Sequence, residues 1–271
     1  MKKYWKYIVL GVIAVGLYTL FFQKKGEEPL QPRDFAEIAQ SKTLRAVTEY
    51  NSISYHAEGD TVGGFNYELL NTFARDKGLT PEITPEMSFE KRLEGVLTGK
   101  FDILANNTMV TSESKDSLLF THPILLNKQV LVQRKSTQEN DSMHIHSQLD
   151  LARKTLHVVK GSPAILRIRN LGNEIGDTIF VEEVEKYGPE QLLAMVAHGD
   201  IDYAVCDESI AEASQNDYPQ LDIKTPVSFT QFYSWGVSKH SPALLDSLNV
   251  WLDTYTKTPE FKKLLNKYYN N

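Results

Sequence analysis

Polar and aromatic residues occur in four short stretches of the sequence, and together they could recognise a small molecule that carries both charges. The stretches contain Glu49, Tyr50 and Tyr55, then Asn106, Asn107 and Thr108, then Gly161 and Ser162, and finally Asp207. Gly161 and Ser162 precede Pro163, which favours the first turn of a helix, and such a turn attracts an anion. The carboxylate of Asp207 suits a cation such as an ammonium group. The set therefore favours an amino acid or the end of a peptide as the ligand.

Each stretch follows an apolar segment that is typical of a buried β-strand. These strands are expected at residues 44–48, 102–105, 156–159 and 202–205. In open α/β sheets, ligands bind beyond the carboxyl ends of the strands, so the four stretches are expected to meet at one site. Asp207 keeps a second interpretation, because residues 210–213 look helical and an Asp in front of a helix can cap it. One carboxylate can serve both purposes.

The chain contains two copies of one order of elements. Each copy runs strand, helix, strand, helix, glycine turn and strand, and the turns at 99–102 and 199–202 both read Gly-x-x-Asp. Alternating strands and helices predict a parallel sheet with helices on both faces. Two helices that begin at Pro242 and Pro259 are expected to pack back on the first copy. We therefore predict an α/β fold of two lobes joined by a hinge, with lobe one at 42–132 and 226–271 and lobe two at 133–225.

An uncharged run of 16 residues at 7–22 predicts a membrane segment. As a helix it would be about 24 Å long, somewhat short of the roughly 30 Å hydrocarbon core. A cleaved signal peptide is the alternative, although no small-residue cleavage site follows the run. More positive charge before the run than after it places the body outside. We predict a cytoplasmic stub and transmembrane anchor at 1–25 and a linker at 26–41, with one pass through the inner (cytoplasmic) membrane and the body in the periplasm.

The net charge of −6 hides an asymmetry along the chain. Residues 1–26 carry five lysines and no acid, so the remaining 245 residues hold 24 basic and 35 acidic groups. A body this acidic excludes nucleic acid as a partner, since that affinity depends on neutralising phosphates. The single cysteine, Cys206, excludes an internal disulfide, and we assign it to a buried strand end. His144 and His146 are assigned to a surface loop and are too few for a metal site, so neither a metal nor a cofactor is predicted.

Four blocks of the sequence, taken in order, resemble the solute-binding protein family 3, the bilobed receptors for amino acids. The blocks are LRAVTEYNSISY, GGFNYELLNTFARDKGL, LEGVLTGKFDILANNTMVTSESK and LLFTHPI, and the resemblance spans roughly residues 42–270. The segment 199–223 and the anchored N-terminus are similar to the receptor-like N-terminal domain of the membrane-bound lytic murein transglycosylase F group. The resemblance implies a type II periplasmic-binding-protein fold with a hinge, and it makes Asp207 the expected partner of a ligand ammonium group.

Two features depart from what the resemblance implies. The family usually carries an Arg after Thr-x-Glu that grips the ligand carboxylate with two parallel bonds. Here Thr111-Ser112-Glu113 is followed by Ser114, and the adjacent Lys115 is a flexible point charge rather than an equivalent fork. The transglycosylases also carry a lysozyme-like domain after the receptor module, whereas this sequence ends at Asn271. We therefore expect the general-acid Glu for glycoside cleavage to be missing.

The leading hypothesis is a non-catalytic, membrane-anchored solute-binding domain that closes on an amino acid, a short peptide or a muropeptide. Tyr50 and Tyr55 would wall the site, and 106–108 with Thr111 would supply hydrogen bonds. The partner would be an ABC permease for uptake or a cell-wall enzyme for envelope sensing. One alternative is a regulatory relative of the transglycosylase that acts on cell-wall turnover through a partner. Another is a dehydratase-like enzyme with Glu49 and Asp207 as acid and base. A nearby aromatic group is assigned to core packing rather than to the cleft: Phe232, Tyr233 and Trp235.

Overall fold

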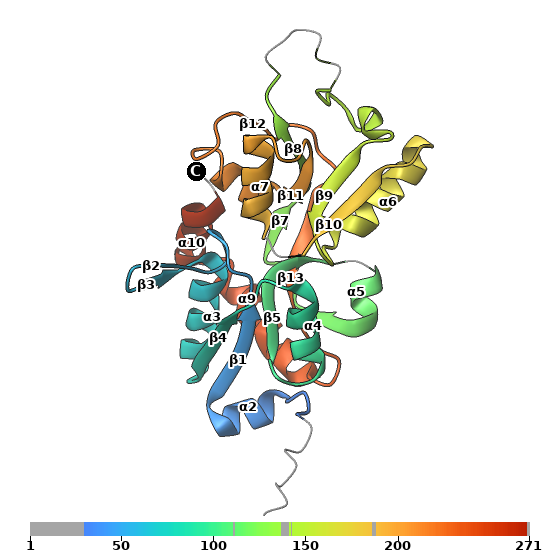
Figure 1. The fold of residues 1–271 in the computed structure, drawn as a ribbon. Coiled ribbons are helices and arrows are strands. Elements are labelled where there is room, and N and C mark those ends of the chain that lie inside the picture. The colour runs from blue at the N-terminus through green and yellow to red at the C-terminus, as the bar shows by residue number, and fades with distance from the viewer. Residues whose placement is uncertain (1–29, 111, 137–140, 142, 186–187, 270–271) are drawn as a thin grey trace, which may run out of the picture. The chain divides into compact units, whose positions relative to one another are not determined.

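The computed structural model describes residues 30–110, 112–136, 141, 143–185 and 188–269, and for residues 107–109, 112 and 113 it describes the backbone only. The chain divides into two units, Met1–Gln31 and Pro32–Asn271, and the elements named below belong to the second (Figure 1). The predicted anchor at 7–22 lies outside the described residues. Within the described ranges, none of the helices is both long enough and apolar enough to cross a membrane.

The sheet of the first lobe has the strand order β4-β1-β5-β13-β6, and β7 also pairs with β13. β1, β4 and β5 run parallel, and β13 runs antiparallel to β5, β6 and β7. The sequence predicts a parallel sheet, but the observed sheet is mixed. The difference arises because β13 enters the sheet from the second lobe. The strands are β1 (Thr43–Thr48), β4 (Thr80–Pro85), β5 (Ile103–Met109), β6 (Leu118–Phe120), β7 (Leu125–Asn127) and β13 (Gln231–Ser238).

The sheet of the second lobe has the order β10-β9-β11-β8-β12. β9, β10 and β11 run parallel, whereas β8 is antiparallel to both β11 and β12. This sheet is mixed for the same reason, since β8 follows β7 of the first lobe without an intervening helix. The strands are β8 (Gln129–Arg134), β9 (Thr155–Val159), β10 (Phe180–Val184), β11 (Ala204–Asp207) and β12 (Leu221–Asp222).

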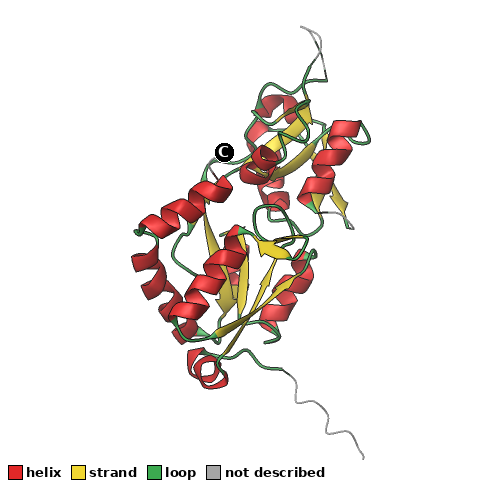
Figure 2. Cartoon of the chain, turned by 90° about the vertical axis from the view of Figure 1, so that its left-hand side faces the viewer, coloured by secondary structure: helices red, strands yellow, loops and turns green. Residues whose placement is uncertain are grey.

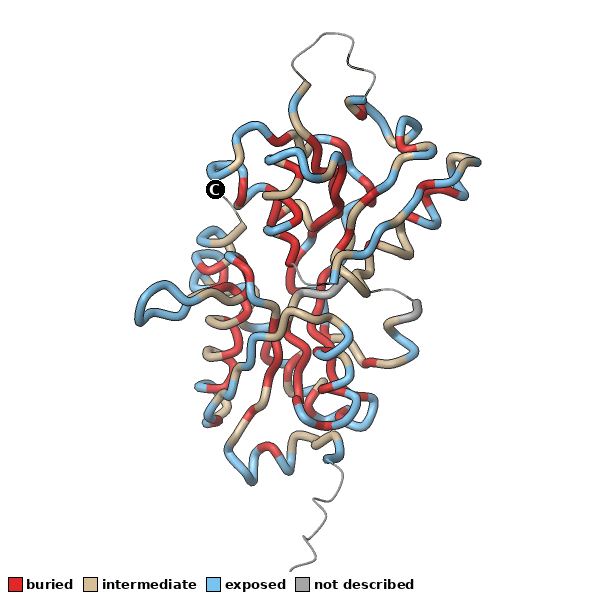
Figure 3. Tube along the Cα trace, viewed as in Figure 1, coloured by how far each residue is buried: buried red, intermediate tan, exposed pale blue. Residues whose placement is uncertain are grey.

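Helices cover both faces of each sheet, as the sequence predicts (Figure 2). In the first lobe, α3, α9 and α10 pack against the face that carries Leu44 and Ala46, while α4 packs against Val47 and Leu104 on the other face. In the second lobe, α6 covers one face, and α7 and α8 cover the other. The buried residues therefore concentrate in the strands and on the inner sides of the helices (Figure 3). The helices are α3 (Phe65–Asp76), α4 (Phe89–Leu97), α6 (Ala164–Ile175), α7 (Pro189–His198), α8 (Glu208–Ala213), α9 (Pro242–Tyr255) and α10 (Pro259–Tyr269).

The two sheets repeat one another. The parallel strands β4-β1-β5 and β10-β9-β11 have the same order, and each set is extended by an antiparallel strand that arrives from the other lobe. The chain thus crosses between the lobes twice, after β7 and before β13. The two Gly-x-x-Asp turns end α4 and α7, where Gly99 and Gly199 adopt φ of +78° and +86°, a conformation that suits glycine. The predicted lobe boundary at residue 132 falls inside β8, which lies in the second sheet along its length.

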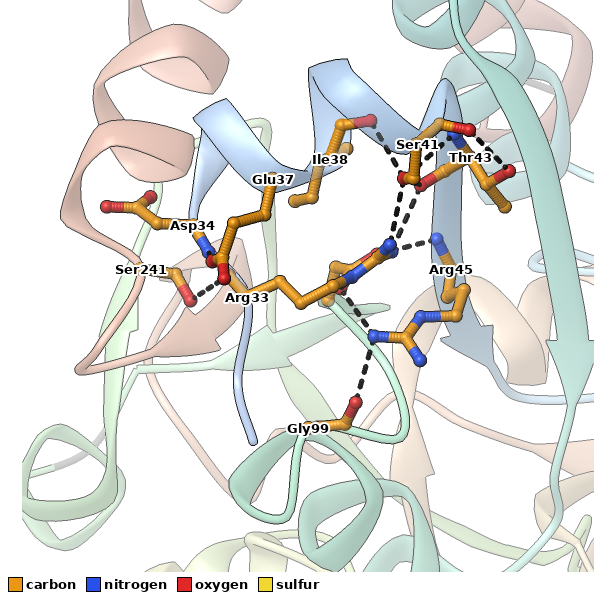
Figure 4. A network of polar contacts seen from close by, with 10 residues as sticks. Arg33, Asp34, Glu37, Ile38, Ser41, Thr43, Arg45, Gly99 and Ser241 are labelled. Atoms are coloured by element: carbon orange, nitrogen blue, oxygen red, sulfur yellow. Dashed lines mark hydrogen bonds and ion pairs between the residues drawn. The ribbon is translucent and has the colours of Figure 1, made fainter. Parts of the chain in front are cut away.

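The segment in front of β1, predicted as the end of a linker, is fixed to the first lobe (Figure 4). Arg33 donates to the Asp102 carboxylate from Nε at 3.0 Å and from Nη2 at 2.6 Å. Asp34 caps α2 (Phe35–Ser41), and it also accepts a hydrogen bond of 2.8 Å from the backbone of Leu244 at the start of α9. The contacts of the first lobe therefore begin at Arg33 rather than at residue 42. Shorter elements complete the chain: β2 (His56–Glu58), β3 (Thr61–Gly63), α5 (Ser112–Ser117) and η1 (Gln148–Leu151).

Candidate functional site

A cavity of about 80 Å³ is lined by side chains from both lobes. The residues that follow β1 and β9 and the last residue of β11 lie on it, which is where open α/β sheets bind their ligands. Polar residues on its wall include Glu49, Arg92 and Tyr233 from the first lobe and Gln129, Ser162 and Asp207 from the second.

Four residues that the sequence predicts for the site line this cavity: Glu49, Asn106, Ser162 and Asp207. The sequence predicts that Asn106 and Asp207 follow their strands, but in the structure both lie within strands, Asn106 in β5 and Asp207 in β11. β5 continues through Asn106 because the returning strand β13 pairs with it on both sides, at Leu104 and at Thr108, with a register irregularity between these pairs. β11 ends on Asp207 because that residue pairs with Gln129 of β8. Strands that arrive from the other lobe thus lengthen both elements and fix the position of both side chains.

The environment of Asp207 favours its neutral form. Burial raises the pKa of Asp207 from 3.8 to about 7. A hydrogen bond of 2.6 Å from Tyr233 Oη to Oδ1 lowers the pKa in part, the charge of Glu49 raises it, and a hydrogen bond from Gln129 lowers it. Asp207 is the residue in front of α8, but its side chain makes no capping hydrogen bond. The carboxylate is therefore available to the cavity, and a cation bound there would favour its ionised form.

A buried ion pair lies on the first-lobe side of the cavity. Arg92 Nη2 and Glu49 Oε1 are 3.1 Å apart, and Arg92 is only 2% exposed. Arg92 Nη1 donates to the backbone carbonyls of Glu86 and Met87 at 2.5 and 2.8 Å. The other oxygen of Glu49 accepts a hydrogen bond of 2.9 Å from Asn51 Nδ2. The loop before α4 therefore holds the guanidinium group in one orientation beside the cavity.

Several residues predicted for the site lie elsewhere. Tyr50, Tyr55 and Lys115 do not line the cavity among the described residues. The rings of Tyr50 and Tyr55 form a pair with centroids 6.2 Å apart, and Tyr50 is exposed. Lys115 is exposed on α5. Thr111 and the side chains of 107–108 lie outside the described residues, so their predicted contacts with a ligand stay predictions.

The segment predicted to hold an anion is surrounded by acids. The backbone N–H of Gly161 donates to Glu183 Oε2 at 2.9 Å. A hydrogen bond with Glu185 and the charge of that carboxylate, together with other acidic neighbours, raise the pKa of Lys160. Ser162 lines the cavity. An anion at this segment would therefore meet carboxylates as well as donors, and the assignment of the anion to Gly161 and Ser162 stays a prediction.

A second and larger cavity of about 370 Å³ shares three lining residues with the first, namely Phe89, Ser162 and Pro163. Its wall is mostly apolar and again comes from both lobes, including Leu93, Leu104, Leu118, Phe120, Ile165 and Leu166. Ser114, which stands where the resemblance implies an Arg, lies on this wall. The two cavities together offer a small polar chamber beside a roomier apolar one.

Among the residues that the structure describes, Cys206 and His144 have structural surroundings. Burial raises the pKa of the Cys206 thiol well above its ordinary value, so the thiolate nucleophile is disfavoured. His144 Nε2 lies 3.1 Å from Asp222 Oδ2 in the second lobe. No group of three or more metal-ligating side chains is found in the part of the chain that the structure describes.

Sequence reasoning missed two residues of the site and misjudged a third. Arg92 falls on the apolar face of α4, and a charge on such a face could have marked it as buried and functional. No sequence signal identifies Gln129, because its place at the site follows from the pairing of β8 with β11, which sets it opposite Asp207. Tyr233 is buried as predicted, yet its hydroxyl reaches the site. Its neighbour Phe232 is 60% exposed, so its assignment to the core is wrong.

Two curated relatives indicate what the chain is similar to. It is 28% identical over 259 residues to the membrane-bound lytic murein transglycosylase F of Desulfosudis oleivorans, a match that covers 95% of this chain and 54% of the relative. It is 26% identical over 268 residues to the protein of the same name from Pseudomonas fluorescens, covering 96% of this chain and 52% of the relative. The chain thus spans about half the length of the curated relatives it matches.

Solved structures share the fold. Holo ArgBP from T. maritima matches with a TM-score of 0.70 and 23% identity over 87% of this chain and 99% of that chain. An ancestral arginine-binding protein bound to arginine gives 0.73 and 24% over 84% and 99%. The ancestral amino acid-binding protein AncCDT-1, a precursor of cyclohexadienyl dehydratase, gives 0.73 and 22% over 87% and 99%. These similarities show a two-lobed, mixed α/β fold.

The sequence profile of one family matches most of the chain. It is described as bacterial extracellular solute-binding proteins, family 3, and it covers residues 44–271. That range includes every residue that lines either cavity. The chain therefore belongs to the bacterial extracellular solute-binding proteins, family 3.

Proposed function

We propose that the chain is a non-catalytic receptor domain that closes on a small amino-acid-like or peptide-like solute, held at the cytoplasmic membrane with its body in the periplasm. The observation that carries this proposal is the cavity between the lobes, where Asp207 supplies a partly buried acid and both lobes supply the walls. A solute bound there touches both lobes, so its binding stabilises the closed arrangement over an open one.

Two outputs are proposed for this closure. The similarity to lytic murein transglycosylases supports envelope sensing through a cell-wall enzyme, and the likeness of fold to amino-acid-binding proteins supports uptake through an ABC permease. The anchor at 7–22 rests on the sequence. Copurification from native membranes separates the outputs, because a lytic enzyme supports sensing and a permease supports uptake.

The second cavity narrows the class of solute. Half of the residues on its wall are leucine, isoleucine or phenylalanine, beside the charged Arg169 and Glu183, and it adjoins the polar chamber at Phe89 and Ser162. A ligand whose charged groups occupy the polar chamber could place an apolar side chain there, and burial of apolar surface would add to its affinity. We therefore propose an apolar amino acid, or a peptide that ends in one, as the solute.

We expect apolar L-amino acids to raise the melting temperature of the full chain more than arginine or glutamate does. Binding to the folded state alone stabilises it by about 2.7 kcal/mol at one hundred times Kd. The measurement is a thermal-shift screen at pH 8 with the amino acids, short peptides and muropeptide stems. An Asp207→Ala variant serves as the control that should not respond. Failure of every one of these compounds to stabilise the wild-type chain would contradict the proposal.

A hydrogen bond between the lobes predicts that a variant without it closes less readily on its ligand. The backbone N–H of Ser52 donates to Glu190 Oε1 at 2.9 Å, so a first-lobe loop is held by the first turn of α7. Glu190→Ala removes this acceptor, and we expect ligand affinity to fall about 3- to 10-fold. Glu190→Gln keeps an acceptor oxygen and is expected to bind within about 2-fold of the wild type. Calorimetry, with small-angle scattering to follow closure, checks both, and equal losses in the two variants would contradict the role of this bond.

A dehydratase-like enzyme is the second candidate, and one observation favours it. A partly buried carboxyl group with a pKa of about 7, such as Asp207, is suited to general acid–base chemistry near neutral pH. Incubation of the purified chain with a cyclohexadienyl acid such as prephenate tests this reading. Release of water and carbon dioxide would support it, and no turnover would leave the receptor as the sole candidate.

A further inference from the structure

Two buried polar atoms, on side chains that line the smaller cavity, have no hydrogen-bond partner among the residues that the structure describes. They are Arg92 Nε, a donor, and Gln129 Oε1, an acceptor, and their residues are 2% and 4% exposed. Buried polar atoms without partners are uncommon in native proteins because each costs its desolvation energy. A donor and an acceptor left open on one cavity wall indicate a ligand that carries complementary groups.

The open donor of Arg92 is on the edge of the guanidinium group that recognises carboxylates. Nη1 is taken up by two backbone carbonyls, and Nη2 faces one oxygen of Glu49. Nε and Nη2 lie side by side and can donate two parallel bonds to one carboxylate. A ligand carboxylate can therefore bond to Nε and share Nη2 with Glu49. The carbonyls of Glu86 and Met87 already fix the plane of the guanidinium group, so only the groups that cover Nε have to move to admit the carboxylate.

The open acceptor of Gln129 belongs to an acidic pole. The side-chain amide of Gln129 donates to Asp207, which leaves its oxygen for another donor. Asp207 and Glu49 lie on the same wall. An ammonium group, with three donors and a positive charge, matches this set of oxygens.

We propose that Arg92 binds the carboxylate of the solute and that Gln129 and Asp207 bind its ammonium group. This inference rests on the proposed receptor function and assigns both ends of the ligand. A cavity of about 80 Å³ has room for an ammonium and a carboxylate group on one α-carbon, which favours a free α-amino acid over a peptide whose charged ends lie far apart. Arg92 of α4 thereby supplies the fork that Ser114 cannot.

A chemical cycle tests the contact between Arg92 and the carboxylate. The probes are the amino acid that binds the wild-type full chain best, expected to be L-leucine, and its α-carboxamide, which lacks the negative charge. The wild type is expected to bind the amide about 100-fold more weakly, since a charge-assisted pair is lost. Arg92→Met should bind both probes weakly and within about 3-fold of one another, because the group that tells them apart is gone. Arg92→Lys, which keeps the charge but not the fork, should fall between.

The matched control is Arg45, whose Nε is also buried without a partner but whose side chain is absent from the cavity wall. Arg45→Met is expected to keep the wild-type preference for the acid over the amide. Circular dichroism melts identify any variant that does not fold, and Arg92→Lys then carries the test. If Arg92→Met or Arg92→Lys keeps the full preference, the assignment of Arg92 is overturned while the receptor function stands. If the wild type binds no amino acid, both fall together.

Discussion

Replacing Asp207 by Asn is expected to stabilise the ligand-free protein at pH 8 and to remove most of its affinity for an ammonium-bearing ligand. The protein keeps a partly buried carboxyl group whose pKa is raised from 3.8 to about 7, first of all by its desolvation. Above that pH the group is ionised in a site that disfavours the charge. Asn has nearly the same shape, can accept the hydrogen bond from Tyr233, and carries no charge.

The direction of the pH effect follows from proton linkage. Between about pH 4 and pH 7 the folded state binds more protons at Asp207 than the unfolded state does, so stability falls as the pH rises. The stabilisation is fully present below the unfolded pKa of 3.8 and is lost as the pH passes the folded value of about 7. The penalty at pH 8 is about 2–4 kcal/mol. Asp207→Asn should therefore melt about 5–10 °C higher than the wild type at pH 8. At pH 5 the difference should shrink to less than half of that, because the carboxyl group is then still protonated in the folded state but already ionised in the unfolded state.

Ligand affinity should respond in the opposite sense. A bound ammonium group needs the ionised carboxylate, so the wild-type affinity is expected to fall about tenfold for each pH unit below 7. At pH 8 the Asn variant should bind about 100-fold more weakly, with no pH dependence left in this range. Melting curves and calorimetry at pH 8 and pH 5 measure both effects. The exposed Asp200→Asn is the matched control and should change neither. If Asp207→Asn is less stable than the wild type at pH 8 without ligand, the prediction is wrong. The protein would then fully compensate the negative charge of Asp207.

The strands and helices could be predicted because their apolar periodicity is strong. The paired Gly-x-x-Asp turns predicted a repeat, and the strand orders β4-β1-β5 and β10-β9-β11 show it. Glu49 and Ser162 could be assigned to the site because they follow strands that end at one edge. What local pattern could not give is the antiparallel strand that completes each sheet, since pairing between β13 and β5 joins residues far apart in the chain.

The charged part of the site depends on such distant pairing. Gln129 reaches Asp207 only because β8 and β11 are paired in that register. Arg92 would be an ordinary surface charge on an amphipathic helix if the carbonyls of Glu86 and Met87 did not receive it. Neither the contact of Gln129 with Asp207 nor the contact of Arg92 with these carbonyls can be predicted from residue propensities or from apolar periodicity. The aromatic pair Tyr50 and Tyr55 shows the reverse case, because it lies near the strand end in sequence but not on the cavity wall.

Replacing Asp102 by Ala is expected to be the most damaging of the substitutions considered for the stability of the fold. Its side chain is fully buried and accepts bonds from Arg33 Nε and Nη2 at 3.0 and 2.6 Å, and from the backbone and side chain of Arg45 at 2.8 and 3.2 Å. Ala leaves two guanidinium groups and a backbone N–H without this acceptor. Breaking one partner out of a buried ion pair costs about 3–5 kcal/mol.

The repeat supplies the matched control for this prediction. Asp202 occupies the corresponding position in the second lobe, and its carboxylate lies 2.6 Å from Arg134 Nη2. That pair is open to water, with the side chains of Arg134 and Asp202 39% and 54% exposed. Arg134 also keeps the backbone carbonyls of Val196 and Ile201 as acceptors. Asp202→Ala should therefore cost no more than about 1 kcal/mol.

Urea unfolding of Asp102→Ala and Asp202→Ala at neutral pH measures their free energies of unfolding. Equal losses in the two variants would show that burial does not determine the cost of removing the carboxylate. The cause can be isolated with Arg33. This residue precedes β1, outside the repeated unit, and it bonds to Asp102 with two donors (Figure 4). A double-mutant cycle between Arg33→Met and Asp102→Asn should give a coupling of more than about 1 kcal/mol, and the cycle between Arg134 and Asp202 should give less. The Asp of the repeated Gly-x-x-Asp turn would then stabilise the two lobes by different amounts, because in the first lobe the N-terminal segment covers it. The segment predicted as a linker is in that case a structural part of the lobe, and loosening it would loosen β1, the strand that leads to Glu49.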